Sequence, residues 1–225
     1  RLKVNWQLAD NTKIKFLISQ VDLNDPADIW TIDGSLNTLS DRPGMDSQKT
    51  NSYGMKVFHS FDGFELQSYT SSTDTNVIFS YDADWGNTDS HFPYVYDYFS
   101  ETLRDRKSFN QEFRAVSDSA DFQKNSFFEW VIGANYLELK ESNLKKDDGL
   151  YGDPSDPYGP YASASASSSK YKSSNFSVFG NLDYLLSASL KFSIGLRWED
   201  WEADYSDSLQ ESFNPTDKMS GGKIS

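Results

Sequence analysis

Two features of the sequence constrain the fold most. Apolar residues recur at every second position, and the connections between these segments alternate between short and long. At the start of the chain, the apolar residues Leu2, Val4, Trp6 and Leu8 are separated by single polar residues. A period of two places the two kinds of side chain on opposite faces of a β-strand. The sequence therefore predicts strands with one polar and one apolar face.

The same alternation continues along the chain and defines the other predicted strands. It is clearest at residues 176–186 and 192–198, where aromatic and aliphatic residues alternate with Ser, Asn, Asp and Arg. Weaker segments occur at residues 13–24, 53–61, 64–81, 108–117 and 127–139, and a short one at 219–225. Together with the first segment they give about nine strands.

The connections fall into two classes that alternate along the chain. The short ones are residues 9–12, 62–63, 118–125 and 187–190, and the long ones are residues 25–48, 86–106, 146–173 and 206–218. Asp62-Gly63 is a strong signal for a two-residue hairpin turn. Short turns at one end and long loops at the other are typical of outer-membrane β-barrels. We therefore predict an all-β fold, an antiparallel up-and-down meander that is part of a large transmembrane β-barrel, with a soluble β-sandwich or propeller as the alternative.

Composition narrows the class of protein without deciding it. No apolar run reaches the 18 residues of a transmembrane helix, but a barrel strand alternates its faces and needs no such run. The formal net charge of −13 argues against a nucleic-acid partner, because phosphate binding needs a basic surface. The chain has no cysteine, which excludes disulfides and thiolate metal sites.

Residues that could carry catalysis or bind a metal give no pattern strong enough to predict either. His59 and His91 have no second histidine at metal-ligand spacing. The carboxylates Glu199, Asp200, Glu202 and Asp204 are typical of a solvated strand end, although a glycosidase could use two of them across a cleft. Residues 147–161 offer oxygen ligands but lack the EF-hand spacing, and the Ser- and Ala-rich residues 162–174 indicate a mobile loop. We expect no enzyme activity and no cofactor.

Four segments in succession resemble the barrel strands of TonB-dependent receptors. They are Phe-Asn-Gln-Glu-Phe-Arg-Ala-Val-Ser at residues 109–117, Trp-Val-Ile-Gly-Ala-Asn-Tyr at 130–136, Ser-Val-Phe-Gly-Asn-Leu-Asp-Tyr at 177–184 and Lys-Phe-Ser-Ile-Gly-Leu-Arg-Trp-Glu at 191–199. Their order and spacing match that family, and the resemblance is firm over residues 108–204.

The resemblance implies a function in transport across the bacterial outer membrane. It implies a receptor that takes up a scarce nutrient such as an iron–siderophore complex, driven by TonB through a plug domain. We expect residues 1–225 to be an internal part of the barrel domain, with the plug and the remaining strands outside this chain. The ligand class stays open, and a soluble or surface-attached β protein that binds glycans is the alternative function.

The pattern also assigns faces to individual residues. We expect Phe176, Val178, Leu182, Tyr184, Phe192, Ile194 and Leu196 to face lipid. We expect Asn110, Glu112, Arg114, Asn181, Asp183 and Arg197 to face the lumen. The aromatic loop residues Trp85, Tyr94, Tyr96, Tyr151 and Tyr158 are candidates for ligand contact, because aromatic rings stack on the flat or apolar parts of ligands.

Overall fold

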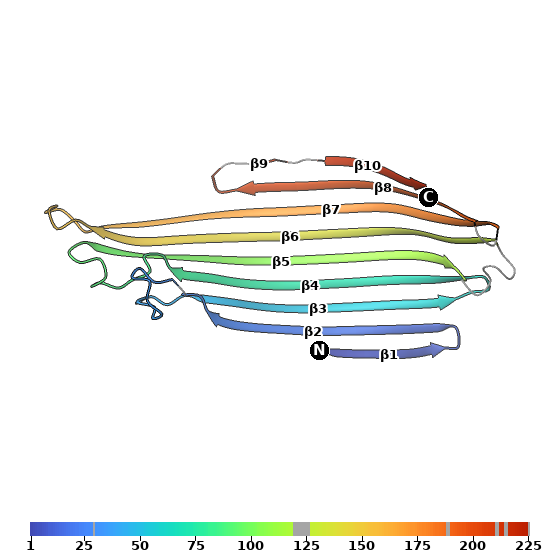
Figure 1. Cartoon of the computed structure of the whole chain (residues 1–225), viewed down its shortest axis with the longest axis horizontal. Coiled ribbons are helices and arrows are strands. Elements are labelled where there is room, and N and C mark those ends of the chain that lie inside the picture. The colour runs from blue at the N-terminus through green and yellow to red at the C-terminus, as the bar shows by residue number, and fades with distance from the viewer. Residues whose placement is uncertain (29, 119–126, 188–189, 210–211, 214–215, 225) are drawn as a thin grey trace.

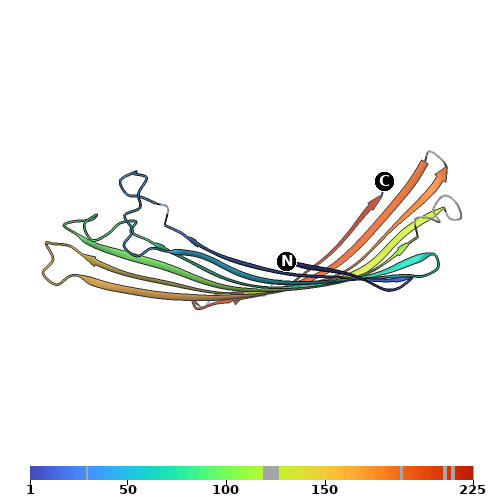
Figure 2. The ribbon, with the colours of Figure 1, turned by 90° about the horizontal axis from the view of Figure 1, so that it is seen from below.

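The strands of the protein form one open, twisted sheet. A computed structural model describes residues 1–28, 30–118, 127–187, 190–209, 212–213 and 216–224. The strands lie in sequence order across the sheet (Figure 1), and the view from below shows a single curved layer (Figure 2). Within the described residues there is no helix with the length and apolar character of a membrane span.

In the part of the chain that the structure describes, ten strands make up the sheet. They are β1 (Leu2–Ala9), β2 (Thr12–Pro26), β3 (Met45–Ser60), β4 (Phe64–Asp82), β5 (Val95–Ser117), β6 (Phe128–Gly152), β7 (Tyr161–Ser187), β8 (Leu190–Asp207), β9 (Ser212–Phe213) and β10 (Thr216–Ile224). The nine predicted strands correspond to β1–β8 and β10, and the two-residue β9 pairs with β8.

The predicted antiparallel meander is confirmed for the described residues. Each strand from β1 to β8 pairs with its neighbours in sequence, and β10 pairs with β8. The turns β1–β2 and β3–β4 lie at one end of the sheet, and the long connections β2–β3, β4–β5 and β6–β7 lie at the other (Figure 1). At the β3–β4 turn, the Phe61 amide donates to the Phe64 carbonyl at 2.8 Å, and Gly63 has a φ of 83°. Most of the predicted turn at residues 118–125 lies outside the described residues.

Four strands extend far beyond their predicted ends, which corrects the predicted long loops. β3 begins at Met45, β5 begins at Val95, and β6 continues to Gly152. The prediction of a mobile loop at residues 162–174 was wrong, because these residues form the first half of β7 and pair with β6. Backbone hydrogen bonds to an extended neighbour do not require apolar side chains, so a Ser- and Ala-rich segment can join the sheet.

The register places apolar side chains of eight strands on one face, in the half of the sheet next to the short turns. We call this set the apolar band: Leu2, Val4, Trp6, Ile14, Phe16, Ile18, Tyr53, Met55, Val57, Phe64, Leu66, Phe109, Phe113, Ala115, Phe128, Trp130, Ile132, Ala134, Tyr136, Phe176, Val178, Leu182, Tyr184, Phe192, Ile194, Leu196 and Trp198. No Asp, Glu, Lys or Arg of β1–β8 lies within the band, and its edge away from the short turns is marked by Glu138, opposite Phe109, and Asp200, opposite Phe176.

Polar residues enter the band only at β4 and β5, where they bind one another. The Thr70 hydroxyl donates to Gln111 Oε1 at 2.6 Å, and Gln111 Nε2 donates to the Ser68 hydroxyl at 3.1 Å. These side chains thereby satisfy much of their hydrogen-bonding capacity within the sheet, which lowers the cost of placing them in an apolar environment.

Aromatic rings gather at the short-turn edge of the apolar band. The Phe128 and Tyr184 rings lie 4.8 Å apart, and the Phe64 and Trp130 rings 6.3 Å apart. Outer-membrane barrels carry aromatic girdles of this kind where the apolar surface meets the membrane interface.

Candidate ligand-binding site

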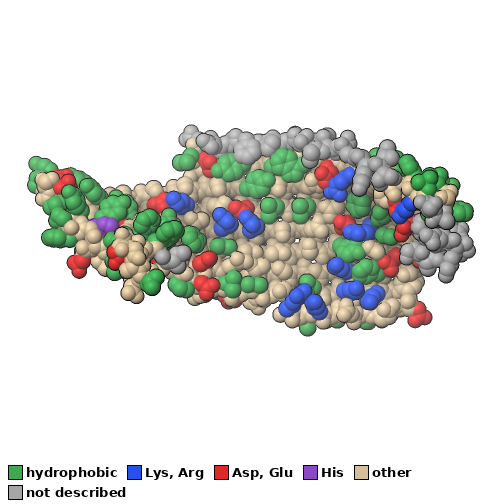
Figure 3. Space-filling view, in the orientation of Figure 1, with side chains coloured by type: hydrophobic (Ala, Val, Ile, Leu, Met, Phe, Trp, Pro, Cys, Tyr) green, Lys and Arg blue, Asp and Glu red, His purple; other side chains and the backbone are tan. Residues whose placement is uncertain are grey.

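The face opposite the apolar band, which we call the polar face, carries the predicted lumen residues. Figure 3 shows this face, because Lys, Arg, Asp and Glu side chains appear on it next to the short turns, where the opposite face carries the apolar band. The register places all six predicted lumen residues on it: Asn110, Glu112, Arg114, Asn181, Asp183 and Arg197. The predicted segregation of the two groups is therefore present in the sheet.

Arg114 is the centre of one group of contacts on the polar face. Its guanidinium pairs with Glu112, two residues along β5, and lies 4.7 Å from the centre of the Tyr69 ring on β4. The Tyr69 hydroxyl donates to Gln67 Oε1 at 2.6 Å. Charged and aromatic groups are thus held in place by neighbours on the same face, which makes this surface ordered as well as polar.

A second group of contacts lies on β6–β8. Arg197 pairs with Glu199 and lies 5.8 Å from the centre of the Phe179 ring. Asp183 forms an ion pair with Lys191 Nζ at 2.7 Å and accepts a hydrogen bond from Asn181 Nδ2 at 3.2 Å. Both signs of charge therefore recur across the sheet, as expected for a surface that faces water rather than lipid.

Aromatic side chains converge at the long-loop end of the polar face. The Tyr96 ring lies 4.7 Å from that of Tyr98, 6.4 Å from that of Tyr151 and 5.0 Å from that of His91. We call these four residues the aromatic cluster. Tyr96 is 41% exposed and Tyr151 is 40% exposed, so the cluster offers ring surface to a ligand.

The other three predicted ligand contacts lie outside this cluster. Trp85, at a φ of 59°, stacks on Trp30 with ring centres 5.8 Å apart. Tyr94 is about half exposed, and Tyr158 stands 84% exposed in the connection between β6 and β7. Sequence reasoning missed His91 and Tyr98 as members of the cluster. Tyr96 and Tyr98 share a face of β5 because they are two residues apart, but the predicted strand at residues 108–117 left both in a loop.

The β2–β3 loop is anchored to the long-loop end of the sheet. Arg42 pairs with Asp97 at 3.1 Å and with Asp148 at 2.8 Å, and its guanidinium lies 4.7 Å from the centre of the Phe99 ring. The carboxylate of Asp28 accepts from the backbone N–H groups of Gly44 and Asp82. These contacts hold the Asp28 and Arg42 parts of the loop against β4–β6.

Asp82 and Asp84 are buried where β4 ends, well beyond the apolar band. Asp82 is 1% exposed, and Asp84 Oδ1 accepts from the Tyr98 amide at 3.1 Å while its Oδ2 lies 3.3 Å from His91 Nε2. Burial raises the pKa of Asp82 above its ordinary value, and the neighbouring Asp84 raises it further. The aromatic cluster is thus connected through His91 to a buried acidic pair.

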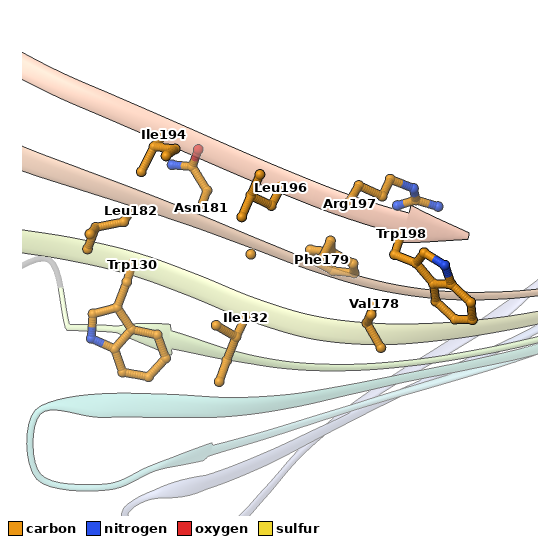
Figure 4. A pocket seen from close by; sticks show the side chains of 11 residues that line it. Trp130, Ile132, Val178, Phe179, Asn181, Leu182, Ile194, Leu196, Arg197 and Trp198 are labelled. Atoms are coloured by element: carbon orange, nitrogen blue, oxygen red, sulfur yellow. The ribbon is translucent and has the colours of Figure 1, made fainter. Parts of the chain in front are cut away.

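A hollow of about 820 Å³ lies at β6–β8 and is lined mainly by side chains of the apolar band. Phe179, Asn181 and Arg197 of the polar face also border it. Figure 4 shows Trp130 and Ile132 on one side of the sheet and Phe179 and Arg197 on the other. An open apolar surface of this kind suits acyl chains better than a polar nutrient.

The sequence also raised metal binding and glycoside hydrolysis as roles for the acidic residues. Within the described residues no group of three or more His, Asp or Glu could hold a metal ion. The register places Glu199 on the polar face, whereas Asp200, Glu202 and Asp204 are on the opposite face. The carboxylates considered for glycoside hydrolysis are therefore divided between two faces.

Comparison with known proteins identifies the family. The family model described as TonB dependent receptor-like, beta-barrel, matches residues 4–225. No curated protein sequence matches the chain. The chain belongs to the β-barrel domain of the TonB-dependent receptors, which are proteins of the bacterial outer membrane.

Solved structures share the fold at low sequence identity. The ferric yersiniabactin uptake receptor FyuA from Yersinia pestis is 13% identical with a TM-score of 0.56, over 95% of this chain and 31% of that protein. The ferric citrate transporter FecA is 10% identical with a TM-score of 0.60, and the match covers 97% of this chain and 31% of FecA. BauA, the ferric preacinetobactin receptor from Acinetobacter baumannii, is 12% identical with a TM-score of 0.58, and the match covers 99% of this chain and 36% of BauA. The chain therefore spans about a third of the length of these proteins.

Proposed function

We propose that this chain is part of a receptor that imports a scarce nutrient, such as a ferric siderophore, across the outer membrane. In this proposal the apolar band faces lipid and the polar face lines the lumen of a barrel. The remaining barrel strands and the plug lie outside residues 1–225, and TonB acts through that plug. The observation that carries the proposal is that the apolar band next to the short turns contains no charged residue, whereas the polar face behind it carries Lys, Arg, Asp and Glu.

The family assignment favours this function over a soluble protein that binds glycans. A soluble sandwich would cover the apolar band with a second sheet, whereas all described strands of this chain belong to one layer. The solved proteins that share the fold are named as receptors or transporters of ferric compounds, and this supports iron as the cargo. Membership in a family of transport receptors also supports a role without catalysis.

The aromatic cluster is the part of the chain best suited to contact the nutrient. It lies on the polar face at the end of the long loops, which in barrels of this type is the extracellular end. Tyr96 and Tyr151 occupy directly opposite positions on β5 and β6, so both rings are held by rigid strands. Exposed rings on a rigid support bind a flat or apolar ligand at low entropic cost.

The test is uptake by the complete parent receptor in an iron-starved strain that lacks it. Cells are offered a panel of ferric siderophores, haem and cobalamin, each with a radioactive metal, with and without a functional TonB. We expect TonB-dependent uptake of at least one ferric siderophore. Uptake of only haem or cobalamin would refute iron–siderophore transport, and no uptake of any compound would refute the general proposal.

Variants at the aromatic cluster test the binding site. Tyr96→Ala and Tyr151→Ala should each weaken binding of the transported ligand by about 3- to 10-fold, the loss of one ring contact. Tyr96→Phe keeps the ring and should bind nearly as the parent receptor does. Leu36→Ala is a matched control, because Leu36 is fully exposed in the β2–β3 loop. If the alanine variants bind as the control does, the cluster is not the contact site, and Tyr158→Ala then tests the tip of the β6–β7 loop.

A further inference from the structure

A hollow on the polar face near the short turns is lined by three lysines and by no carboxylate. It measures about 640 Å³ and lies over β1–β5. The amines belong to Lys3 on β1, Lys15 on β2 and Lys56 on β3, and in the part of the chain that the structure describes no Asp or Glu borders this space. Figure 3 shows Lys and Arg side chains gathered over these strands at the lower edge of the sheet. Three residues of the opposite face also border it: Phe16, Met55 and Thr70. We call this space the lysine hollow.

The three amines are close together and have no ion pair. Lys15 is directly opposite Lys56, and Lys3 is diagonal to Lys15 because it is opposite Leu17. Directly opposite residues have Cβ atoms about 5 Å apart, and diagonal ones are about 7–8 Å apart. Among the described residues no carboxylate forms an ion pair with any of the three lysines. Like charges at this spacing destabilise a sheet, so an anion bound between them would contribute stability.

Aromatic rings hold two of the amines without neutralising them. Lys15 Nζ lies 5.1 Å from the centre of the Phe58 ring, and Lys56 Nζ lies 5.0 Å from the centre of the Tyr69 ring. The face of a ring attracts a cation through its quadrupole and carries no net charge. The two amines are therefore positioned by the strands' own side chains and keep their positive charge for a ligand.

The carboxylates beside the lysine hollow have other partners or lie outside it. Glu112 pairs with Arg114, and Glu65 Oε1 accepts a hydrogen bond from a glutamine amide at 2.7 Å. Asp10 and Asp62 belong to the two short turns, beyond the ends of the strands. The hollow itself thus has a positive potential in a chain whose net charge is −13, and this suits an anion.

Small and amide side chains shape the rest of the lysine hollow. The register places Gly54 between Leu17 and Ser71, so the middle of the hollow has little side-chain volume. Asn110 Oδ1 accepts from Asn135 Nδ2 at 2.8 Å, which leaves the Asn110 amide N–H groups for another acceptor. Sites for small molecules in proteins measure about 300–1,000 Å³, and the lysine hollow is within this range.

The lysine hollow is far from the aromatic cluster. Lys15 is three residues from Thr12, where β2 begins after a short turn. Lys15 and Lys56 are level with Glu112 on β5, which is sixteen positions from Tyr96. A rise of about 3.4 Å per residue makes this about 54 Å along the strand. The two places are therefore separate sites, and the lysine hollow is at the end that faces the periplasm in barrels with short periplasmic turns.

We propose that the lysine hollow binds a small polyanion with carboxylate or phosphate groups, and that this polyanion is the imported nutrient on its way to the periplasm. The inference rests on the proposed function, because it takes the polar face to line the lumen, and it adds that the nutrient is negatively charged. Each amine donates charge-assisted hydrogen bonds to the anion. A small molecule is the occupant because the amines surround a hollow of small-molecule size.

The first experiment measures binding of propane-1,2,3-tricarboxylate and of tripolyphosphate to the complete parent receptor, purified in detergent at constant ionic strength. At least one of them should bind. The triple variant Lys3→Gln, Lys15→Gln and Lys56→Gln should bind it about 10- to 100-fold more weakly, the loss of several hydrogen bonds to a charged group. The triple Lys→Arg variant keeps the charge and should bind within a fewfold of the parent. Binding of neither anion overturns the proposal.

Two further variants separate the lysine hollow from charge in general. Replacing Lys107, Lys140 and Lys172 by glutamine removes three lysines from the opposite face, and this control should bind as the parent does. Gly54→Val fills the hollow and keeps every amine. A Cβ at Gly54 would lie 3.6 Å from Leu17 Cβ, an ordinary contact, so the strand accepts the change. Gly54→Val should weaken binding. Parent-like binding by this variant, or an equal loss in the control, overturns the proposal.

Amine labelling distinguishes a small anion from an acidic part of the receptor itself, such as a segment of the plug. The complete receptor is treated with limiting acetic anhydride, and acetylated lysines are quantified by mass spectrometry. Lys15 and Lys56 should react without an added anion and should be protected by the tricarboxylate. Amines that stay unreactive in both conditions are covered by the receptor, which overturns the proposal. Equal protection by sodium acetate would show screening by salt and would also overturn it.

Uptake by cells distinguishes failure of this inference from failure of the proposed function. If the parent receptor imports an anionic ferric chelate, the triple Gln variant should import it about tenfold more slowly, because a cleft of one charge concentrates its ligand. Binding of the chelate at the cell surface should stay unchanged, because the aromatic cluster is intact. Equal uptake by both receptors, or uptake of only uncharged and cationic chelates, overturns this inference and leaves the proposed function standing. Uptake of nothing refutes the proposed function, whereas binding in detergent still tests the hollow.

Discussion

Replacing Ile132 by arginine tests whether the apolar band faces lipid. Ile132 is 56% exposed, and its neighbours across the strands are Ala115 and Gly180, so no carboxylate is opposite it to pair with a new charge. It lies four residues from Phe128 and four from Tyr136, about 10 Å of depth from each at a tilt of about 40°. This places it near the middle of the bilayer.

The expected cost follows from that depth. An arginine on the lipid face at the bilayer midplane costs about 2–4 kcal/mol, which lowers the folding equilibrium constant by roughly 30- to 1,000-fold. The assay is reversible unfolding in urea of the complete receptor in lipid vesicles, followed by the shift of the folded band on a gel. A change to leucine at the same position should be nearly neutral.

Val131→Arg is the matched control, because Val131 is the adjacent β-branched residue on the polar face, opposite Val116 and Asn181. We expect it to cost less than about 1 kcal/mol, as for other exposed positions. Equal losses for Ile132→Arg and Val131→Arg would refute the reasoning. A larger loss for Val131→Arg would reverse the assignment of the two faces.

Three further predictions concern the loops and the packing of the sheet. The pKa of Asp82 is raised in the folded chain, so its protonated form contributes stability at low pH, and this contribution is lost as pH rises through the folded pKa. Asp82→Asn should therefore make the protection of the β2–β3 loop amides, corrected for their intrinsic exchange rates, less dependent on pH between 4 and 8, and an unchanged dependence would contradict this. Arg42→Lys should increase hydrogen exchange in the β2–β3 loop, because lysine cannot form both ion pairs and also stack on the Phe99 ring. Equal exchange in the variant and the parent would show that other contacts hold the loop. A Cβ at Gly133 would lie 2.5 Å from the Phe179 ring and 2.8 Å from a backbone carbonyl. Gly133→Val should therefore destabilise the barrel by about 1–3 kcal/mol in the urea assay. Gly63→Asn, at a turn position with no neighbouring atoms, should destabilise it less.

Alternation was sufficient to predict the strand order and the faces. Residues such as Phe176, Val178 and Ile194 are separated from Asn181 and Arg197 by parity alone, because the side-chain period of a strand is two. The same rule predicted the meander, since a short turn can join only adjacent antiparallel strands. The succession of four family-like segments then predicted the receptor family, which the family model confirms.

The lengths of the strands could not be predicted in the same way. The segment at residues 162–174 has small polar side chains and no apolar periodicity, so nothing local favours a strand. It is a strand because the neighbouring long strand β6 offers its backbone N–H and C=O groups from Glu138 to Leu150. That partner is chosen by the register of the whole sheet, which a local pattern does not contain.

The sequence by itself determined which face each strand residue occupies, because parity is a local property of an extended chain. Only the tertiary structure decided which residues meet across strands. It joined Tyr96 to Tyr151 and His91, and it aligned Lys107, Lys140 and Lys172, which are 33 and 32 residues apart in sequence, in one row. Those meetings depend on the register between strands, and a shift of two residues in one strand would keep every face and still separate every partner.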